Sequence, residues 1–434
     1  MYFSLDVRRA RKGDCLLLHF GTKDDPGLVM VDGGPSDVYV PHLKPRLAQI
    51  RKARKGPPQN PLVVDLLMVS HVDDDHIKGI LDLTKEMIDA QQAKRPQALQ
   101  VLAFWHNSFD SIIGNTPEEL TAAFKETSFG AAATTGTLPA DARLDAARFE
   151  ERAEREVMVD TLKVLASIEQ GHRLRSDAQR LLFPLNPHFG EKLILANKGG
   201  AAIDIGRELT VTVLGPMKPE LDKLHKMHDE WLAAQKGKKK KSATAALAAY
   251  VDRSVPNLSS IAVLAVAGKK RILLTGDARG DKILAGLEFV GVLKKDGRIH
   301  VEVLKVPHHG SANNLDVAFF ERITADHYVF SGNGEHGNPE RESLQMLLDA
   351  RDDADYTIHL TYPVDEIDAE RKNDWIKEQA KEKARKAKKV RPNWSPAKHS
   401  LAAFLAAHKK LNDKIKIVPK DGRHLIDLHE AVPY

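Results

Sequence analysis

The chain has a single cysteine and no long apolar run. Cys15 stands alone among 434 residues, which excludes an intrachain disulfide and a structural zinc site built from several thiolates. No stretch approaches the roughly 20 consecutive apolar residues needed to cross a bilayer. Residues 1–14 also lack the apolar core of a signal peptide. We therefore expect a cytoplasmic protein with no membrane-spanning segment.

The composition is that of an ordinary globular protein. Hydrophobic residues make up 42% of the chain and charged residues 29%, and the length suffices for two or three domains. The net charge of +5 is mildly basic. Lysine and arginine concentrate in two runs, 236–241 (KGKKKK) and 371–391. Such runs either contact phosphates or form solvated loop and helix surfaces, and the sequence leaves both readings open.

Strands are predicted along most of the chain, with helices between them. Apolar runs bounded by glycine and proline predict strands at 2–7, 15–20, 28–32, 62–69, 99–105, 209–214, 300–306 and 327–330. A helix is predicted over 77–90, where apolar residues recur at core spacing. Residues 260–266 and 271–274 predict a hairpin.

Two segments and the end of the chain differ from this pattern. Residues of about 107–190 and 217–250 are rich in helix-forming types and predict helical insertions, the first with Leu162, Leu165 and Ile168 on one packing face. Beyond them a strand at 356–362, a basic helix and two short strands are predicted. We expect a main domain over 1–345 and a small α/β extension over 346–434.

The densest group of metal-ligand residue types follows the predicted strand 62–69. Residues 70–76 read SHVDDDH, which places His71, Asp73, Asp74, Asp75 and His76 at a strand-to-helix turn. In α/β proteins sites open at this end of a strand. Imidazole and carboxylate ligands together suit zinc, manganese or iron. An acidic helix N-cap would explain the carboxylates, but not the two histidines.

Further ligand types lie at the ends of other predicted strands. Asp32 precedes two glycines at one strand end, Asp277 ends a second apolar run, and His308 and His309 follow a third. A turn aspartate or a pair of surface histidines would explain each feature alone. Their common position at strand ends predicts a metal centre.

These motifs resemble those of the metallo-β-lactamase-fold hydrolases. The family signature H-x-H-x-D-H stands here as HVDDDH, with Asp73 in place of the second histidine, a variant found in phosphodiesterase-like members. The similarity is greatest to the hydrolase domain of the DNA-uptake competence protein ComEC. The shared motifs are GD at 13–14, DGG at 32–34, N-x-S at 257–259, LLTGD at 273–277 and VPHHGS at 306–311. The resemblance covers most of 1–345 and implies an αββα sandwich with a binuclear site at one edge.

The resemblance also implies two groups of metal ligands joined by a bridging carboxylate. They are His71, Asp73 and His106 for the first metal, Asp75, His76 and one of His308 and His309, with His308 favoured, for the second, and Asp277 for the bridge. A lone histidine after a strand is as often structural, which leaves the role of His106 open. Asp32 is expected to orient a ligand histidine from outside the ligand set.

Two departures from the family pattern bear on the chemistry. Where the subgroup has G-H-P, residues 331–339 read SGNGEHGNP, so Asn338 takes the place of the histidine and His336 lies two residues away. His309 or His336 is the expected proton donor to the leaving oxygen. Asp73 adds a negatively charged oxygen ligand, which shifts the expected cofactor from two zinc ions towards manganese or a mixed centre.

The expected activity is metal-dependent hydrolysis. Two metal ions about 3.5–4 Å apart bind a bridging water and lower its pKa, and the resulting hydroxide attacks phosphorus or a carbonyl carbon. The residues expected to act in catalysis are Asp75, His309 and His336. The leading hypothesis is a phosphodiesterase, specifically a nuclease with nucleic acid as substrate. The alternatives are hydrolysis of a small ester, lactone or phosphoester, and a subunit of a bacterial defence-type assembly that binds a protein partner through the insertions or the C-terminal extension.

Overall fold

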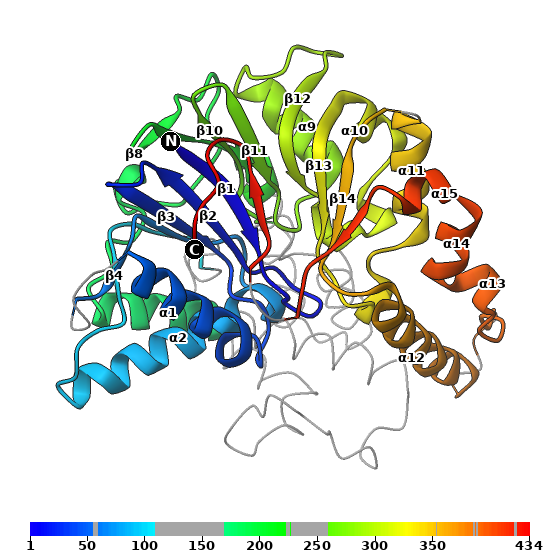
Figure 1. The fold of residues 1–434 in the computed structure, drawn as a ribbon, viewed down its shortest axis with the longest axis horizontal. Coiled ribbons are helices and arrows are strands. Elements are labelled where there is room, and N and C mark those ends of the chain that lie inside the picture. Colours follow the sequence, from blue (N-terminus) through cyan, green and yellow to red (C-terminus); the bar gives the residue numbers. More distant parts are fainter. Residues whose placement is uncertain are drawn as a thin grey trace, which may run out of the picture.

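The structure, a computed structural model, is a mixed α/β fold with two large sheets (Figure 1). It describes residues 1–54, 60–108, 169–222, 226, 259–352, 354–384, 387, 389–420 and 423–434. The six-stranded sheet contains, in order across it, β16 (Leu425–Asp427), β1 (Tyr2–Val7), β2 (Leu16–Gly21), β3 (Pro26–Val31), β5 (Leu66–Val69) and β7 (Phe104–His106). The eight-stranded sheet contains β15 (Ile415–Ile417), β14 (Thr357–Leu360), β13 (Ile323–Phe330), β12 (Ile299–Lys305), β11 (Lys270–Leu274), β10 (Ala262–Ala267), β9 (Leu209–Gly215) and β8 (Ile203–Gly206).

Parallel pairing places several strand ends at one edge of each sheet. In the first sheet β3, β5 and β7 are parallel neighbours, and in the second β11, β12, β13, β14 and β15 are. The carboxyl ends of parallel strands lie at the same edge, so the loops that follow these strands lie close together. The predicted ligand residues stand in those loops.

The facing sides of the two large sheets share one hydrophobic core. Leu66 and Met68 of β5 belong to this core together with Val211 of β9 and Val303 of β12. The alternate β5 residues, Leu67 and Val69, belong to a second core on the other side of the sheet. Successive side chains of a strand point to opposite faces, so a strand buried on both faces is apolar throughout.

Helices cover the outer side of each large sheet (Figure 1). The second core joins the six-stranded sheet to α1 (Lys44–Ala53) and α2 (Asp74–Gln92), whose buried residues include Leu47, Ile80 and Leu83. Beside the eight-stranded sheet lie α9 (Gly280–Phe289), α10 (Val317–Arg322) and α11 (Arg341–Arg351). The described fold thus has two sheets in its interior and helices outside them. None of the described helices combines the length and the apolar character needed to cross a bilayer.

The predicted strands are confirmed, with two of them divided. The run 62–69 forms β4 (Leu62–Val64) and β5, and 99–105 forms β6 (Leu99–Val101) and β7; β4 and β6 pair in a small separate sheet. The first break falls at Asp65, whose buried carboxylate accepts a hydrogen bond from Leu28 N at 2.8 Å and pairs with Arg207. The predicted hairpin is confirmed by the antiparallel pairing of β10 and β11.

Most of the predicted helical insertions lie outside the described residues. This holds for 109–168, with Leu162, Leu165 and Ile168, and for the lysine run 236–241. At the flank of the first insertion, residues 169–180 are helical.

Residues 346–434 contribute to both large sheets. β14 and β15 extend the eight-stranded sheet, and β16 pairs with β1 of the other. Helix α11 runs across the expected boundary at 345. The predicted basic helix is α12 (Val364–Ala384), which is followed by α13 (Pro396–His399), α14 (Leu401–Ala407) and α15 (Lys409–Asn412) (Figure 1, lower right and right).

Candidate metal centre

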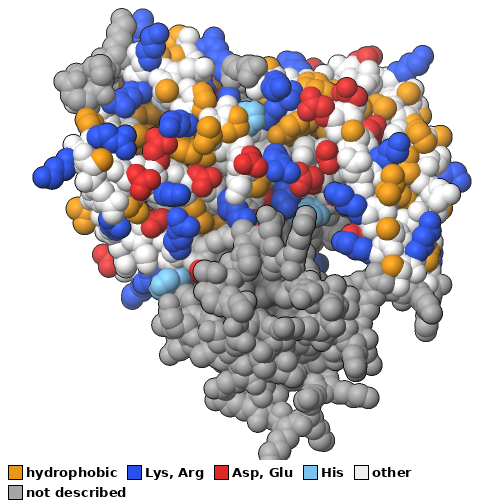
Figure 2. Space-filling view, turned by 90° about the horizontal axis from the view of Figure 1, so that it is seen from below, with side chains coloured by type: hydrophobic (Ala, Val, Ile, Leu, Met, Phe, Trp, Pro, Cys, Tyr) orange, Lys and Arg blue, Asp and Glu red, His pale blue; other side chains and the backbone are white. Residues whose placement is uncertain are grey.

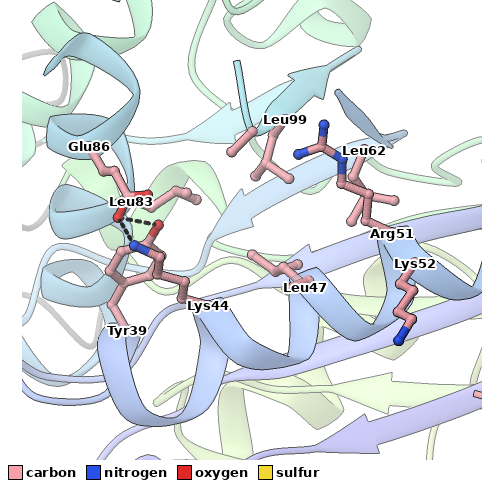
Figure 3. A pocket seen from close by; sticks show the side chains of 11 residues that line it. Tyr39, Lys44, Leu47, Arg51, Lys52, Leu62, Leu83, Glu86 and Leu99 are labelled. Atoms are coloured by element: carbon pink, nitrogen blue, oxygen red, sulfur yellow. Dashed lines mark hydrogen bonds and ion pairs between the residues drawn. The ribbon is translucent and has the colours of Figure 1, made fainter. Parts of the chain in front are cut away.

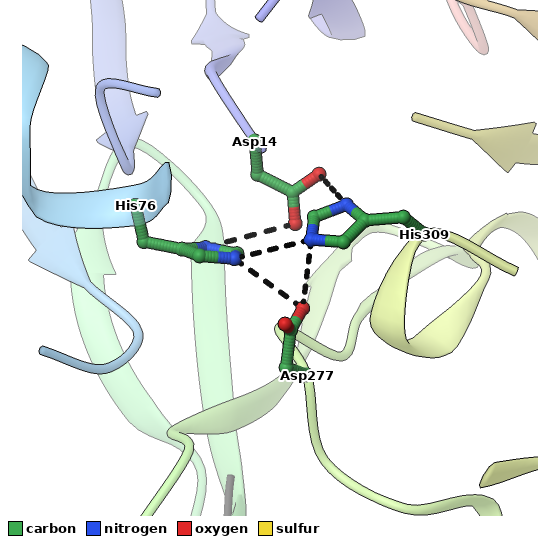
Figure 4. A group of neighbouring side chains, drawn as sticks. All are labelled: Asp14, His76, Asp277 and His309. Carbon is green, nitrogen blue, oxygen red and sulfur yellow. Dashed lines mark hydrogen bonds and ion pairs between the residues drawn. The ribbon is translucent and has the colours of Figure 1, made fainter. Parts of the chain in front are cut away.

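Three loops and the first turn of a helix bring metal-ligand side chains together. Asp14 precedes β2, His76 lies in the first turns of α2, Asp277 follows β11, and His309 follows β12. One ligand atom from each of these four buried residues lies within 4.8 Å of every other (Figure 4). Backbone contacts between the loops hold this arrangement, including His308 N to Gly276 O at 3.2 Å. Gly13 is needed beside it, because a Cβ there would lie 1.8 Å from the carbonyl oxygen of Asp75.

The carboxylate of Asp277 stands between two groups of histidines. Its Oδ1 lies 3.3 Å from both His76 Nε2 and His309 Nε2. Its Oδ2 lies 3.7 Å from His71 Nε2 and 3.6 Å from His308 Nε2. Each oxygen therefore faces a different pair of imidazoles, which is the geometry required of a carboxylate that bridges two cations.

Each histidine pair has an aspartate beside it. We name His71, Asp73 and His308 the first ligand group. In it, His71 Nε2 lies 3.7 Å from Asp73 Oδ2. His309 Nε2 lies 3.7 Å from Asp75 Oδ2 and 3.3 Å from His76 Nε2 in the second ligand group, made of Asp75, His76 and His309.

The structure separates the two adjacent histidines, and it assigns them differently from the resemblance. His309 lies in the second ligand group, where His308 was favoured, and His308 lies in the first. Both residues have left-handed backbones, with φ of 47° and 55°. Their ring planes are 76° apart, so neighbouring side chains reach different oxygens of Asp277. Such backbones are strained for residues other than glycine, and strain of this kind concentrates at functional sites.

His106 lies outside the four converging residues. It ends β7 beside β5, in register with Val69. Its ring stacks on Phe104 with the centroids 5.7 Å apart, and its Nε2 lies 3.4 Å from the carbonyl oxygen of Gly171. The structure therefore supplies a buried histidine at the strand end that the resemblance implied, in contact with the helical segment 169–180.

Asp32 orients His76, the role that the resemblance implied for it. Its Oδ2 lies 2.8 Å from His76 Nδ1, and the carboxylate also accepts hydrogen bonds from the backbone N and the Oγ of Ser70, both at 2.7 Å. A proton on Nδ1 leaves the lone pair of Nε2, which lies 3.3 Å from Asp277 Oδ1, free to bind a cation. Gly33 permits this turn to approach α2, because a Cβ there would lie 2.6 Å from the backbone N of Ile80.

A buried lysine near the site was not expected from the sequence. Lys305 ends β12 with its side chain fully buried, and its Nζ lies 2.5 Å from Asp14 Oδ2 and 3.1 Å from Gly276 O. The Oγ of Ser331 donates a hydrogen bond to Asp14 Oδ1 at 2.5 Å and lies 3.0 Å from His309 Nδ1. Both oxygens of Asp14 thus have partners, and through Ser331 the residue orients His309. The Gly13-Asp14 motif signalled Asp14, but nothing local distinguishes Lys305 from a lysine at a solvated strand end.

His336 lies beside Lys12, with His336 Nε2 3.3 Å from Lys12 Nζ. Lys12 is two residues from Asp14 along the chain, so the histidine stands next to the loop that carries Asp14. Its backbone N–H donates to the carboxylate of Asp374 in α12. Asn338, which stands where the family has histidine, is buried and donates from Nδ2 to His308 O at 3.4 Å.

Burial and close opposite charges shift the pKa values of several groups at the site. Burial raises the pKa of Asp73 to about 8, together with the nearby carboxylates of Asp75 and Asp277. Burial opposes protonation of His309, but the carboxylate of Asp277 raises its pKa to about 9. Burial also opposes protonation of His76, but the carboxylates of Asp277 and Asp32 raise its pKa well above the usual value. Protons on histidines balance the clustered carboxylates here, and divalent cations would replace them.

The residues present fit divalent cations. Four ligands about 2.1 Å from a metal in tetrahedral arrangement stand roughly 3.4 Å apart, close to the 3.3–3.7 Å separations around Asp277. Among the described residues, the buried Nε2 of His71 has no hydrogen-bond partner, which is rare for a buried polar atom. Imidazole nitrogens together with carboxylate oxygens suit zinc and manganese.

A separate cavity lies away from these groups (Figure 3). It has a volume of about 470 Å³ and lies between α1, α2 and the strands β4 and β6. Leu47, Leu62, Leu83 and Leu99 give it an apolar wall. Glu86 at one end binds Tyr39 and Lys44. None of the ligand residues lines it, so it is not the pocket that serves the proposed centre.

Comparison with known proteins does not show the family of this chain. No model of a protein family matches it. A partial match links the chain to the microtubule-associated protein futsch of Drosophila melanogaster, at 35% identity over 77 residues. This match spans 17% of the chain and 1% of that protein, so it shows neither a shared fold nor a shared activity.

Proposed function

We propose that this protein is a metal-dependent hydrolase of the metallo-β-lactamase fold that acts on phosphodiesters, most specifically as a nuclease. The observation that carries the proposal is the carboxylate of Asp277, whose two oxygens face two separate pairs of histidines. The layer order of helices, sheet, sheet and helices supports the αββα fold implied by the sequence motifs. The position of the ligands in loops after parallel strands supports it as well.

Bound at the two ligand groups, two divalent ions, zinc or manganese, would supply a water molecule of lowered pKa and stabilise charge that develops on a phosphoryl group. Neighbouring side chains position two of the ligand histidines. Asp32 fixes the ring of His76, and Asp14 fixes that of His309 through Ser331. Because these two rings are held in place, the metal ions that they bind would already be positioned to stabilise charge on the phosphoryl group. Little movement of the side chains would then be needed during the reaction.

The proton for the leaving oxygen is assigned to His336. His309 is engaged on both ring nitrogens, with Nδ1 near Ser331 and Nε2 in the second ligand group. His336 instead has an exposed ring beside Lys12. The ammonium of Lys12 beside His336 would also attract a phosphate, which favours a phosphodiester over a neutral ester.

Metal content and a substrate panel test the proposal. The full chain is loaded with Mn²⁺ or Zn²⁺, its metal content is measured, and it is assayed on bis-p-nitrophenyl phosphate, single-stranded DNA, RNA, a cyclic nucleotide, p-nitrophenyl acetate and a lactone. We expect close to two ions per chain and cleavage of the phosphodiesters.

Asp75→Ala is expected to lose metal and activity together. Asp74→Ala is the matched control, because Asp74 adjoins Asp75 but is half exposed and pairs with Lys78 at 2.6 Å. Absence of bound metal in the parent would refute the metal centre. Hydrolysis of the acetate or lactone alone would leave a metal-dependent hydrolase but refute the phosphodiesterase.

A further inference from the structure

A groove in the C-terminal part of the chain adjoins the proposed metal centre. It has a volume of about 540 Å³ and lies between the start of α11, helix α12 and the segment 391–399. This volume lies within the range of pockets that hold nucleotide-sized ligands. The groove contains two tryptophans and more cationic than acidic side chains.

One end of the groove contacts two loops of the candidate metal centre, the loop that carries Asp14 and the loop that carries His308 and His309. His336 lines it and contacts Lys12, two residues before Asp14. Glu340 lines it as well, accepting a hydrogen bond from Ser311 Oγ at 3.3 Å and donating its backbone N–H to Gly310 O at 3.1 Å. Gly310 and Ser311 directly follow His308 and His309. The lining of the groove is therefore in direct contact with the loop that carries His308 and His309.

One wall of the groove is aromatic and rigid. The ring of Trp375 is stacked on His399, with centroids 4.1 Å apart and planes 26° apart, and the guanidinium of Arg391 lies 5.1 Å from its centroid. Its Nε1 donates to Pro392 O at 2.8 Å. Trp394 leans edge-on against Trp375 at 5.9 Å and remains partly exposed. The ring of Trp394, held against Trp375 and partly exposed, offers a platform on which a base can stack.

Two cations of the groove are available to a phosphate. The lining lysines 377 and 381 pair with lining acids at 3.7 and 2.5 Å. Arg341 and Lys398 have no ion pair with a carboxylate among the described residues; the guanidinium of Arg341 donates to the carbonyl oxygen of Lys398 and lies 5.5 Å from the ring of Phe404. Figure 2 shows lysine and arginine side chains interspersed with hydrophobic ones on its right side, where Figure 1 places α12 to α14.

We propose that this groove binds one strand of nucleic acid beside the phosphodiester that is cut, with a base stacked on Trp394 and backbone phosphates on Arg341 and Lys398. The inference rests on the proposed phosphodiesterase function. It assigns to the segment 391–399 and to α12 the task of holding an unpaired strand. A duplex does not expose the faces of its bases, so it cannot use the aromatic wall in this way.

Binding without metal tests the groove apart from catalysis. Fluorescein-labelled oligo(dT) and oligo(U) are titrated with the full chain in the presence of a chelator, and their anisotropy is followed from low to moderate salt. Trp394→Ala is expected to weaken binding by about 5- to 100-fold, whereas Trp394→Phe retains a ring and most of the affinity. The double substitution Arg341→Gln with Lys398→Gln is expected to reduce the slope of log K against log salt by about 1.4, for two lost phosphate contacts.

The matched control is Lys372→Gln with Lys409→Gln, which removes two exposed cations that do not line the groove. It should bind within about twofold of the parent. A second readout is hydrolysis of the small substrate bis-p-nitrophenyl phosphate, which the groove variants should leave unchanged while raising KM for oligonucleotides.

Groove variants that bind and cleave oligonucleotides like the parent would overturn this inference and leave the proposed function intact. A parent that binds neither oligonucleotide would also overturn it. Loss of phosphodiester hydrolysis across the whole substrate panel, with binding retained, would instead count against the proposed function.

Discussion

Replacing Lys305 with methionine should destabilise the protein more than any exposed charge change. Lys305 and Asp14 are 0% and 2% exposed at their side chains, and their charged atoms lie 2.5 Å apart. At an effective dielectric constant of about 20, two unit charges at 2.5 Å attract by about 7 kcal/mol. The cost of removing both groups from water offsets much of this attraction. Removing one member of such a pair leaves a buried, unpaired charge and typically costs about 3–5 kcal/mol.

A double-mutant cycle isolates the pair. Lys305→Met and Asp14→Asn are each expected to be strongly destabilising, while the double variant loses several kcal/mol less than the sum of the two, because neither charge is then left unpaired. The free energy of unfolding is measured by urea titration with a chelator present, following both tryptophan fluorescence and circular dichroism. Coincidence of the two transitions checks that unfolding is two-state.

Lys270→Met serves as the control for this cycle. Lys270 pairs with Glu302 at 3.2 Å but is 38% exposed, and such pairs contribute roughly 0–1 kcal/mol. A loss below about 1 kcal/mol for Lys305→Met would refute the reasoning, since it is too small for a buried unpaired carboxylate. Strict additivity in the cycle would refute it as well, because the pair would then carry no coupling.

Three further outcomes are expected. Asp32→Asn should weaken metal binding by about 10- to 100-fold, measured by competition with a chromogenic chelator, because the carboxylate that orients His76 loses its charge; unchanged affinity would contradict this role. Cys15 should resist a thiol reagent at pH 8 until the protein is unfolded, since burial raises its pKa to about 12; rapid labelling of the native protein would show the burial to be wrong. Burial and two neighbouring histidines lower the pKa of His359 to about 2, so between pH 6.5 and 2 the unfolded chain binds a proton that the folded chain does not. Stability should therefore fall with decreasing pH below about 6.5, by up to about 1.4 kcal/mol per unit from this residue, and urea titrations of His359→Gln should show a shallower dependence than the parent.

His359 of the last prediction is the middle member of a chain of three histidines. The other two are His327 in β13 and His424, which precedes β16. His327 Nδ1 lies 3.1 Å from His359 Nε2, and His359 Nδ1 lies 2.8 Å from His424 Nε2. The two nitrogens of His359 point to opposite neighbours, so the three rings do not converge on one point as the imidazoles around Asp277 do. Ligand residue types alone therefore do not make a metal site; the convergence of their lone pairs does.

Local pattern sufficed for most of the elements and for the location of the site. Strand β5 is apolar throughout because Leu66 and Met68 face one core and Leu67 and Val69 face another. Helix α2 follows the period of its buried residues and begins at Asp74, earlier than the predicted start at 77, because two aspartates suit its first turn. Ligand types at strand ends predicted a common site, since parallel strands present their carboxyl ends at one edge.

Tertiary structure determined which histidine belongs to which ligand group. No periodicity states whether His308 or His309 joins a given ligand group, because their directions follow from strained backbones held between packed loops. The break at Asp65 likewise depends on Arg207, which is distant in the chain. The lysine that ends β12 is fully buried only because Asp14, from the opposite sheet, meets its ammonium there. A sequence fixes residue types and local periods, whereas the pairing of buried charges depends on which distant segments the folded core brings within a few ångströms.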